Sequence, residues 1–266
     1  MNFQDRVVLI TGASNGIGRR LAIDLAARGA IVVGCGRSSE RLQATSAEMQ
    51  RTSPLSTAIK CDVAKLDQVR AMVTGVLSKF GKIDILINNA GIGMRKPFAE
   101  TPIEVIEELM RTNYFGVVYC THEALPSMIA RGRGHIVIIS SVAGKIGVLN
   151  IAGYCASKFA MNGLSESLYY ELAPLGINVS VICPGPVRTD FNKSFADTPP
   201  KSPASLVVSA EFVSAAVIKA IEGRHFEVVL PRWLALICWF KRMTPNLFRA
   251  IADRNFRQRI VETKKT

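Results

Sequence analysis

The chain has 266 residues and a mass of 29.0 kDa, the size of one large α/β domain. Hydrophobic residues make up 48% of it and charged residues 20%, which is enough for a core with two sides. No internal repeat or low-complexity segment is present, which excludes a repeat array. The net charge is +12, and +7 of it lies in the last 36 residues.

Cysteine and histidine positions argue against a disulfide framework and against a metal site. The six cysteines form no C-x-x-C pair, and several fall inside predicted strands or helices, where a free cysteine acts as a small hydrophobe. This favours a reducing compartment. His122, His135 and His225 are far apart and lack ligand spacing. Because the first strand begins almost at the N-terminus and leaves no room for a signal peptide, the prediction is a cytoplasmic protein.

Apolar runs rich in β-branched residues alternate along the chain with helical patterns. Several runs are apolar without alternation, as is typical of strands covered on both faces. Right-handed crossovers predict an α/β fold, a Rossmann-like doubly wound parallel sheet of about seven strands with helices on both faces. The predicted strands are 6–11, 30–35, 56–61, 83–88, 134–140, 177–183 and 226–230, and the predicted helices are 16–28, 39–52, 65–80, 102–131, 153–174 and 209–222.

The first strand leads into a glycine-rich turn, Thr11-Gly12-Ala13-Ser14-Asn15-Gly16-Ile17-Gly18, and then into a helical pattern. A strand, a glycine turn and a helix in this order are the context of a dinucleotide site. Gly12 permits the turn, Gly16 lets the backbone approach a pyrophosphate, and Gly18 lets the helix pack closely on the strand. The N–H groups at the helix N-terminus attract phosphate. A purely structural turn is the alternative.

A possible proton-transfer group lies in the second half of the chain. Ser141 follows the apolar run 135–139, at the end of a predicted strand where open α/β sheets place their ligands. Tyr154 and Lys158 are four residues apart on a predicted helix and therefore share one face. A nearby ammonium favours an ionised phenol, so Lys158 is predicted to lower the pKa of Tyr154. Taken alone, this pair is also compatible with chance placement on a solvated helix face.

With these motifs in this order and spacing, the chain resembles the classical short-chain dehydrogenase/reductase family over roughly residues 5–230. The turn matches the family's Thr-Gly-x-x-x-Gly-x-Gly motif, and further matches are Asn88-Asn89-Ala90-Gly91 after the fourth strand and Pro184-Gly185 with Val187 and Thr189 after the sixth. The resemblance implies that residues 1–230 form a Rossmann-fold dinucleotide-binding and catalytic domain, extended by residues 231–266. The catalytic tetrad it implies is Asn113, Ser141, Tyr154 and Lys158. The cofactor-binding positions it implies are Gly12, Ser14, Asn15, Gly16, Ile17, Gly18, Arg37, Asp62, Val63, Asn89, Ala90, Gly91, Tyr154, Lys158, Pro184, Gly185, Val187 and Thr189.

In this family a hydride passes between the nicotinamide and a carbonyl or carbinol carbon. Tyr154 would donate a proton to the carbonyl oxygen or accept one, Ser141 would polarise that oxygen, and Lys158 would lower the pKa of Tyr154 and hold the nicotinamide ribose. Asn113 would stabilise a break in the helix predicted over 102–131 and support a water relay to Lys158. Ser140 is the rival serine, but only Ser141 has the family's offset to Tyr154.

The end of the second strand bears on cofactor choice. Gly36 stands where NAD-preferring relatives hold an acidic residue, and Arg37 beside it can pair with a 2′-phosphate, so the prediction is NADP(H) in preference to NAD(H). Asn15 stands where some NADP-preferring relatives carry a second basic residue, and a solvated surface arginine is the alternative for Arg37. Asp62 resembles the family's adenine-binding residue.

Candidate substrate-pocket residues, assigned by family position, are nearly all apolar. They favour an apolar, lipid-like ketone, aldehyde or secondary alcohol, although ordinary packing would explain any one of them. Residues 191–208 are predicted to form a lid. The candidates are Gly93, Met94, Val142, Leu149, Pro186, Phe191 and Phe195.

The segment 231–266 is basic and partly apolar. Its apolar stretch 233–240 is bracketed by cations and is too short to span a bilayer. One interpretation is a helix at the surface of an anionic membrane. Another is a helix packed over the substrate cleft or at a subunit interface, and nucleic-acid binding is the weakest because no nucleic-acid motif accompanies the aromatic residues.

The leading hypothesis is an NADP(H)-dependent oxidoreductase, a homodimer or homotetramer in the cytoplasm, with a peripheral membrane location as a further option. Two alternatives stay open. One is reduction of 3-oxoacyl groups on a carrier protein, for which the basic surface could dock an acidic partner. The other is a cofactor-binding regulatory protein without turnover, against which the intact tetrad argues.

Overall fold

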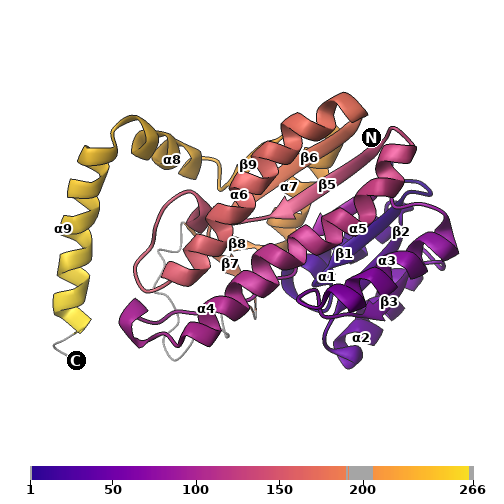
Figure 1. Cartoon of the computed structure of the whole chain (residues 1–266), viewed down its shortest axis with the longest axis horizontal. Helices are drawn as coiled ribbons and strands as arrows, with labels where there is room; N and C mark the ends of the chain where they lie inside the picture. The colour runs from indigo at the N-terminus through magenta and orange to yellow at the C-terminus, as the bar shows by residue number, and fades with distance from the viewer. Residues whose placement is uncertain (1, 190, 192–205, 264–266) are drawn as a thin grey trace.

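Seven parallel strands form the central sheet of the computed structural model, which describes residues 2–189, 191 and 206–263 (Figure 1). The order across the sheet is β3-β2-β1-β4-β5-β6-β9, and after β3, which forms one edge, the chain crosses back to add β4 beside β1. The strands are β1 (Val7–Thr11), β2 (Ile31–Gly36), β3 (Thr57–Lys60), β4 (Ile85–Asn88), β5 (Gly134–Ile139), β6 (Ile177–Pro184) and β9 (Glu227–Leu230). The doubly wound parallel sheet predicted from the sequence is therefore confirmed.

Helices cover both faces of this sheet (Figure 1). Alternate residues of each strand face opposite layers, so Val8 and Ile10 pack with one set of helices while Val7 and Leu9 pack with the other. The first set is α1 (Gly16–Ala26), α2 (Ser39–Gln50) and α7 (Ala210–Gly223), and the second is α3 (Leu66–Phe80), α5 (Gly116–Ala130) and α6 (Ala152–Leu172). A core on each face explains the uninterrupted apolar runs of the strands.

The helix predicted over 102–131 is not continuous. It consists of α4 (Ile103–Leu109), a π-helical segment (Met110–Phe115) and α5. Asn113, in the π-helical segment, is completely buried and binds the backbone of Ile92 through its side chain. π-Helical turns are rare and occur mostly as single insertions within α-helices, frequently at functional sites, and this one accompanies a buried amide side chain.

Shorter elements complete the described part of the chain. The strands β7 (Val187–Arg188) and β8 (Val208–Ser209) form a small parallel pair that sequence patterns did not predict. After β9 come α8 (Leu234–Met243) and α9 (Pro245–Thr263), which extend away from the sheet (Figure 1). Among the described residues, every helix is too short or too polar to cross a bilayer.

His135 at the start of β5 is a buried titratable group away from the ends of the strands where ligands bind. Ser180 donates its hydroxyl hydrogen to the carbonyl of His225, so the Nε2–H of His135 donates to Ser180 Oγ at 2.8 Å. Burial, with a smaller contribution from the charge of Arg224, lowers the pKa of His135 to about 4. The imidazole is therefore neutral in the folded protein at pH values where an unfolded chain would protonate it.

This arrangement predicts a loss of stability in mild acid. The unfolded histidine binds a proton below about pH 6.5, whereas the folded one does so only near pH 4. The stabilisation is complete above pH 6.5 and is lost as the pH falls toward 4, by roughly 3 kcal/mol in total. Denaturant unfolding at a series of pH values should show a smaller loss for His135→Gln than for wild type. The exposed control His122→Gln should match wild type, and equal slopes for all three proteins would contradict the prediction.

Candidate active site

The glycine-rich turn between β1 and α1 has the backbone that its glycines predict. Gly12 and Gly16 have φ values of +69° and +54°, which L-residues with side chains rarely adopt. A Cβ on Gly18 would collide with the carbonyl oxygen of Gly12, so α1 approaches the turn as closely as it does only because residue 18 is glycine. Asn15 caps α1 by accepting the N–H of Gly16 at 2.7 Å. The helix N-terminus therefore begins at the turn, as an anion site requires.

Asn89 holds this turn in place from the end of β4. Its side-chain nitrogen donates to the carbonyls of Thr11, at 2.9 Å, and Gly12, at 3.2 Å. In return, the Thr11 hydroxyl accepts the backbone N–H groups of Asn89 and Ala90, each at 3.0 Å. Thr11 was quoted in the motif but not predicted as a site residue. Its position directly before Gly12 was the available signal.

Other predicted cofactor positions lie around the same turn. A Cβ on Gly16 would lie 3.1 Å from the side chain of Thr189, and one on Gly36 would lie 3.2 Å from Ser14 Oγ. The loop after β6 and the end of β2 thus border the glycine turn. Ile17 packs on the core behind the turn, and Val187 is buried. We call the glycine turn and the ends of β2, β4 and β6 around it the cradle. Because it has no room for a Cβ at Gly18, the backbone of the turn is open to close approach, which fits a dinucleotide.

The predicted adenine side of the site is formed by the ends of β2 and β3. Arg37 is exposed directly after β2. Asp62 is half-buried, and one of its carboxylate oxygens accepts the N–H of Ala64 at 3.1 Å. Val63 is buried and packs against Gly116, where any Cβ would touch it. Arg37 is therefore an exposed cation at this end of the cradle, where Lys60 at the end of β3 is exposed as well.

Asn113 links the loop after β4 to helix α6. Its oxygen accepts the N–H of Ile92 at 2.8 Å, and its nitrogen donates to the carbonyl of Ile92 at 3.0 Å and to Ser157 Oγ at 2.9 Å. A Cβ on Gly91 would lie 3.1 Å from the Asn113 oxygen and 3.8 Å from Lys158 Nζ. The predicted break in the helix is present at Asn113. Ile92 and Ser157 are partners that the sequence reasoning missed, although Ser157 lies directly before Lys158.

Lys158 is buried beneath the site and points toward the end of β5. Its ammonium donates to the carbonyl of Ile139 at 3.0 Å and lies 5.6 Å from the centroid of the Tyr154 ring. Burial lowers the pKa of Lys158 to about 8, because a charge is costly away from water. A single carbonyl compensates only in part for that cost.

Tyr154 is also buried, and its ring packs among Leu109, Ala143 and Ile151. Burial raises the pKa of the Tyr154 phenol well above its ordinary value, while a hydrogen bond with Ser141 acts in the opposite direction. The predicted lowering of this pKa by Lys158 is therefore wrong for the protein chain alone. Shared helix spacing brings the two residues together, but desolvation of the phenol is the largest influence on its pKa.

Ser141 and its rival Ser140 face different partners. Ser141 Oγ accepts the N–H of Ala143 at 3.1 Å and approaches the carbonyl of Pro184 at 3.3 Å, in addition to its bond with Tyr154. Ser140 is buried and donates to the carbonyl of Lys158 at 3.3 Å. Of the two serines, only Ser141 is placed with Tyr154, in agreement with strand alternation.

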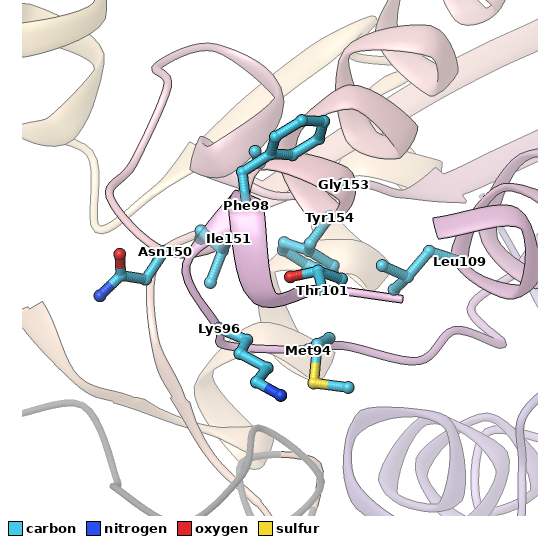
Figure 2. A pocket seen from close by; sticks show the side chains of 10 residues that line it. Met94, Lys96, Phe98, Thr101, Leu109, Asn150, Ile151, Gly153 and Tyr154 are labelled. Carbon is cyan, nitrogen blue, oxygen red and sulfur yellow. The ribbon is translucent and has the colours of Figure 1, made fainter. Parts of the chain in front are cut away.

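A small hollow with a volume of about 10 Å³ lies against Tyr154 (Figure 2). The loop after β4 and the segment before α6 form its walls, joined by a hydrogen bond from the Lys96 N–H to the Asn150 carbonyl at 2.7 Å. Its lining mixes apolar and polar groups, so it is less uniformly apolar than predicted. The lining residues are Met94, Lys96, Phe98, Thr101, Leu109, Asn150, Ile151, Ala152, Gly153 and Tyr154.

The predicted pocket residues are only partly brought together here. Met94 lines the hollow, and the Phe191 ring lies 6.2 Å from that of Tyr154. Val142 instead packs with the cluster beneath α8. Gly93, Leu149 and Pro186 are half-buried but do not line the hollow. Phe195 and most of the predicted lid lie outside the described residues.

Histidine, cysteine and acidic side chains are the possible metal ligands of this chain. Within the described ranges, no group of three or more histidine, cysteine or acidic side chains is arranged to hold a metal ion. The six cysteines are free, and five of them are buried.

The parallel sheet, the glycine turn clamped by Asn89, and the Ser141–Tyr154–Lys158 group at the carboxyl ends of the strands define a dinucleotide-binding protein of the Rossmann class. The chain belongs to the short chain dehydrogenase family, whose family model matches residues 6–200. It is thus a member of an oxidoreductase family.

Two curated relatives illustrate the range of similarity. The zebrafish Danio rerio protein "Dehydrogenase/reductase SDR family member 7B" is 41% identical over 197 residues, covering 72% of this chain but only 64% of the relative. The mouse Mus musculus protein "Epidermal retinol dehydrogenase 2" is 32% identical over 249 residues, covering 92% of this chain and 80% of the relative. The chain thus spans less than two thirds of the zebrafish protein.

Solved structures of related proteins share the fold over more than nine tenths of the chain. A short chain dehydrogenase/reductase from Burkholderia phymatum, in complex with NAD, is 26% identical with a TM-score of 0.85, covering 93% of this chain and 96% of that one. A short-chain dehydrogenase from Sphingobium yanoikuyae, in complex with NADPH, is 30% identical with a TM-score of 0.79, covering 91% and 95%. Related proteins therefore bind either nicotinamide dinucleotide.

Proposed function

We propose that this protein is an NADP(H)-dependent oxidoreductase that interconverts a carbonyl group and a secondary alcohol on an apolar, lipid-like substrate. The observation that carries this proposal is the meeting of Ser141, Tyr154 and Lys158 beside both the glycine turn and the hollow at Tyr154. We infer a homodimer or homotetramer in the cytoplasm, with peripheral membrane contact through residues 231–266.

The side chains divide the proton chemistry among them. Tyr154 gives its phenolic proton to the carbonyl oxygen in reduction and takes a proton from the hydroxyl in oxidation, while Ser141 holds that oxygen by a hydrogen bond. Lys158 lies beneath the phenol and stabilises the tyrosinate that reduction leaves. A bound nicotinamide dinucleotide supplies or accepts the hydride. Asn113 binds both the loop at Ile92 and Ser157 on α6. It thereby fixes the position of Lys158, the next residue on α6, relative to that loop.

The apolar substrate class rests on the surroundings of Tyr154. Leu109, Ile151, Met94 and Phe191 lie around its ring or line the adjoining hollow. The retinol dehydrogenase among the relatives acts on an apolar alcohol according to its name, which is consistent with this class. A panel of aliphatic, aromatic and isoprenoid aldehydes, ketones and alcohols, followed by NADPH absorbance, tests the proposal. Turnover confined to charged substrates would contradict it.

The preference for NADP(H) depends on Arg37. Removing the guanidinium in Arg37→Ala should weaken NADPH binding about ten- to a hundredfold. NADH binding should be nearly unchanged, because only NADPH carries the 2′-phosphate. Since Arg37 is exposed, solvent screening places the effect toward the lower figure. Calorimetric titration of both cofactors measures it. Arg51→Ala at the far end of α2 is the matched control, and equal weakening of both cofactors by Arg37→Ala would make Arg37 structural.

A further inference from the structure

Helix α8 has two faces, and its inner face packs on the catalytic domain. Leu234 is buried and Ile237 is half-buried in the cluster that contains Val142. One turn further along, Lys241 donates to the carbonyl of Lys145 at 2.6 Å and lies 5.1 Å from the centroid of the Phe159 ring. These contacts, spaced three and four residues apart, fix the rotation of α8 about its axis.

The outer face of α8 carries a stripe of large apolar side chains with no cover among the described residues. Trp233, Leu236, Trp239 and Met243 are 41%, 69%, 62% and 60% exposed, and their spacing of three, three and four residues places them on one side of the helix. We call these four residues the α8 stripe. Single exposed apolar residues are ordinary, but a contiguous stripe that includes both tryptophans of the chain indicates a contact surface.

Exposed arginines precede the α8 stripe, lie within α8 and follow it on α9. Arg232 precedes the helix, Arg242 lies within it, and Arg249 and Arg254 follow on α9, all of them exposed. The segment 231–266 holds nine lysines and arginines against Asp253 and Glu262. A second copy of this chain would bring the same positive charge to the contact and be repelled. An anionic lipid surface instead offers acyl chains for the stripe and negative headgroups for the cations.

We propose that the α8 stripe and its flanking arginines form a docking surface for an anionic lipid membrane. The proposal specifies the peripheral membrane contact that is part of the proposed function, and it requires neither bound cofactor nor turnover. Nucleic acid would satisfy the cations but not Leu236 and Met243, which have no flat aromatic face for a base.

Docking in this way would place the active site close to the lipid. α8 follows the carboxyl end of β9, the same edge of the sheet as Ser141. Its Leu234 touches the position where Gly185 would carry a Cβ, and its inner cluster includes Val142, the neighbour of Ser141. Figure 1 shows α4, α8 and α9 at one end of the molecule, so the hollow near α4 and the docking surface share that end. An apolar substrate dissolved in the membrane would then have a short path to Tyr154.

Intrinsic tryptophan fluorescence tests the proposal without a label, because Trp233 and Trp239 are the only tryptophans in the sequence and both belong to the α8 stripe. The full chain, without cofactor, is titrated with vesicles of phosphatidylcholine alone or mixed with phosphatidylserine. The expected result is a blue shift with the mixed vesicles, reversed as salt rises, and quenching by brominated acyl chains.

Point variants identify the surface better than truncation, since removing α8 would also uncover the cluster around Leu234. Leu236→Gln with Met243→Gln keeps both tryptophans and should weaken vesicle binding about tenfold or more. The control Leu55→Gln changes an exposed leucine between α2 and β3 and should leave vesicle binding unchanged. For the charges, Arg242→Gln with Arg249→Gln should weaken binding, whereas Arg51→Gln with Arg133→Gln, which changes the net charge equally, should not.

Three results would overturn the proposal. Unchanged fluorescence with anionic vesicles at low salt would show that the stripe does not meet lipid. A blue shift that depends on protein concentration without lipid, together with a larger mass in light scattering, would assign the stripe to a second copy. A response to an oligonucleotide but not to vesicles would assign it to nucleic acid. Cofactor binding and turnover, measured separately, keep failure of this surface distinct from failure of the enzyme assignment.

Discussion

Replacing Tyr154 by phenylalanine is expected to lower kcat by about 10²- to 10⁴-fold while leaving the fold and cofactor affinity nearly intact. The substitution removes one oxygen and leaves the ring among Leu109, Ala143 and Ile151, so packing is preserved. It also removes the hydrogen bond with Ser141, a small loss. Steady-state kinetics, cofactor titration and denaturant unfolding of the same preparation separate the three effects.

Tyr170→Phe is the matched control because Tyr170 lies on the same helix and is 65% exposed. It loses the same atom far from the site and should retain wild-type kinetics. If Tyr154→Phe turned over substrate as fast as this control, Tyr154 would not transfer the proton and the proposed mechanism would fail.

The sheet could be predicted from the sequence because its signals are local. Each strand of the sheet is a short run of β-branched and aliphatic residues followed by a turn or a helical pattern, and Val7 to Ile10 supply both cores by simple alternation. The glycine turn was equally legible, since positive φ at Gly12 and close approach at Gly18 each demand glycine. Local patterns of this kind need no knowledge of tertiary packing.

The break at Asn113 could not be derived from periodicity. The residues on both sides have ordinary helical character, and what redirects Asn113 is its pair of hydrogen bonds to Ile92, a residue in another segment. Only the family resemblance indicated it. The β7–β8 pair escaped prediction for a similar reason, because two-residue strands carry no periodic signal.

The hollow at Tyr154 shows the same limit on the substrate side. Lys96 and Asn150 meet through a backbone hydrogen bond between two loops, and Thr101 joins them from a third position. None of the three follows from composition or spacing. Val142, predicted at the pocket, packs beneath α8 because the turn after Ser141 directs it there.

Ionisation of the site was the least predictable property. The four-residue spacing predicts that Tyr154 and Lys158 share a helix face, but it does not predict how deeply that face is buried. Depth controls both groups, since burial raises the pKa of Tyr154 and lowers that of Lys158. The electrostatic help that the spacing suggested is smaller than the desolvation that the fold imposes on both side chains.

Lys158→Met should lower turnover by about 10²-fold or more and weaken cofactor binding about tenfold, because one ammonium serves both functions. Methionine nearly matches the length of lysine without its charge, so the buried space stays filled. It leaves the carbonyl of Ile139 without its donor, which is a modest cost in stability. Lys219→Met on the exposed side of α7 is the control for the loss of a lysine and should match wild type.

The pH profile distinguishes this catalytic function of Lys158 from a structural one. In the free enzyme its ammonium is charged below about pH 8 and neutral above it. If the charged form stabilises the tyrosinate, kcat/KM for carbonyl reduction falls as the pH rises through about 8, and the profile of Lys158→Met lacks that step. If Lys158 had only a structural function, Lys158→Met would lower kcat/KM at every pH but would keep the step near pH 8. Persistence of the same alkaline step in Lys158→Met would therefore assign the titration to another group and exclude Lys158 from the proton chemistry.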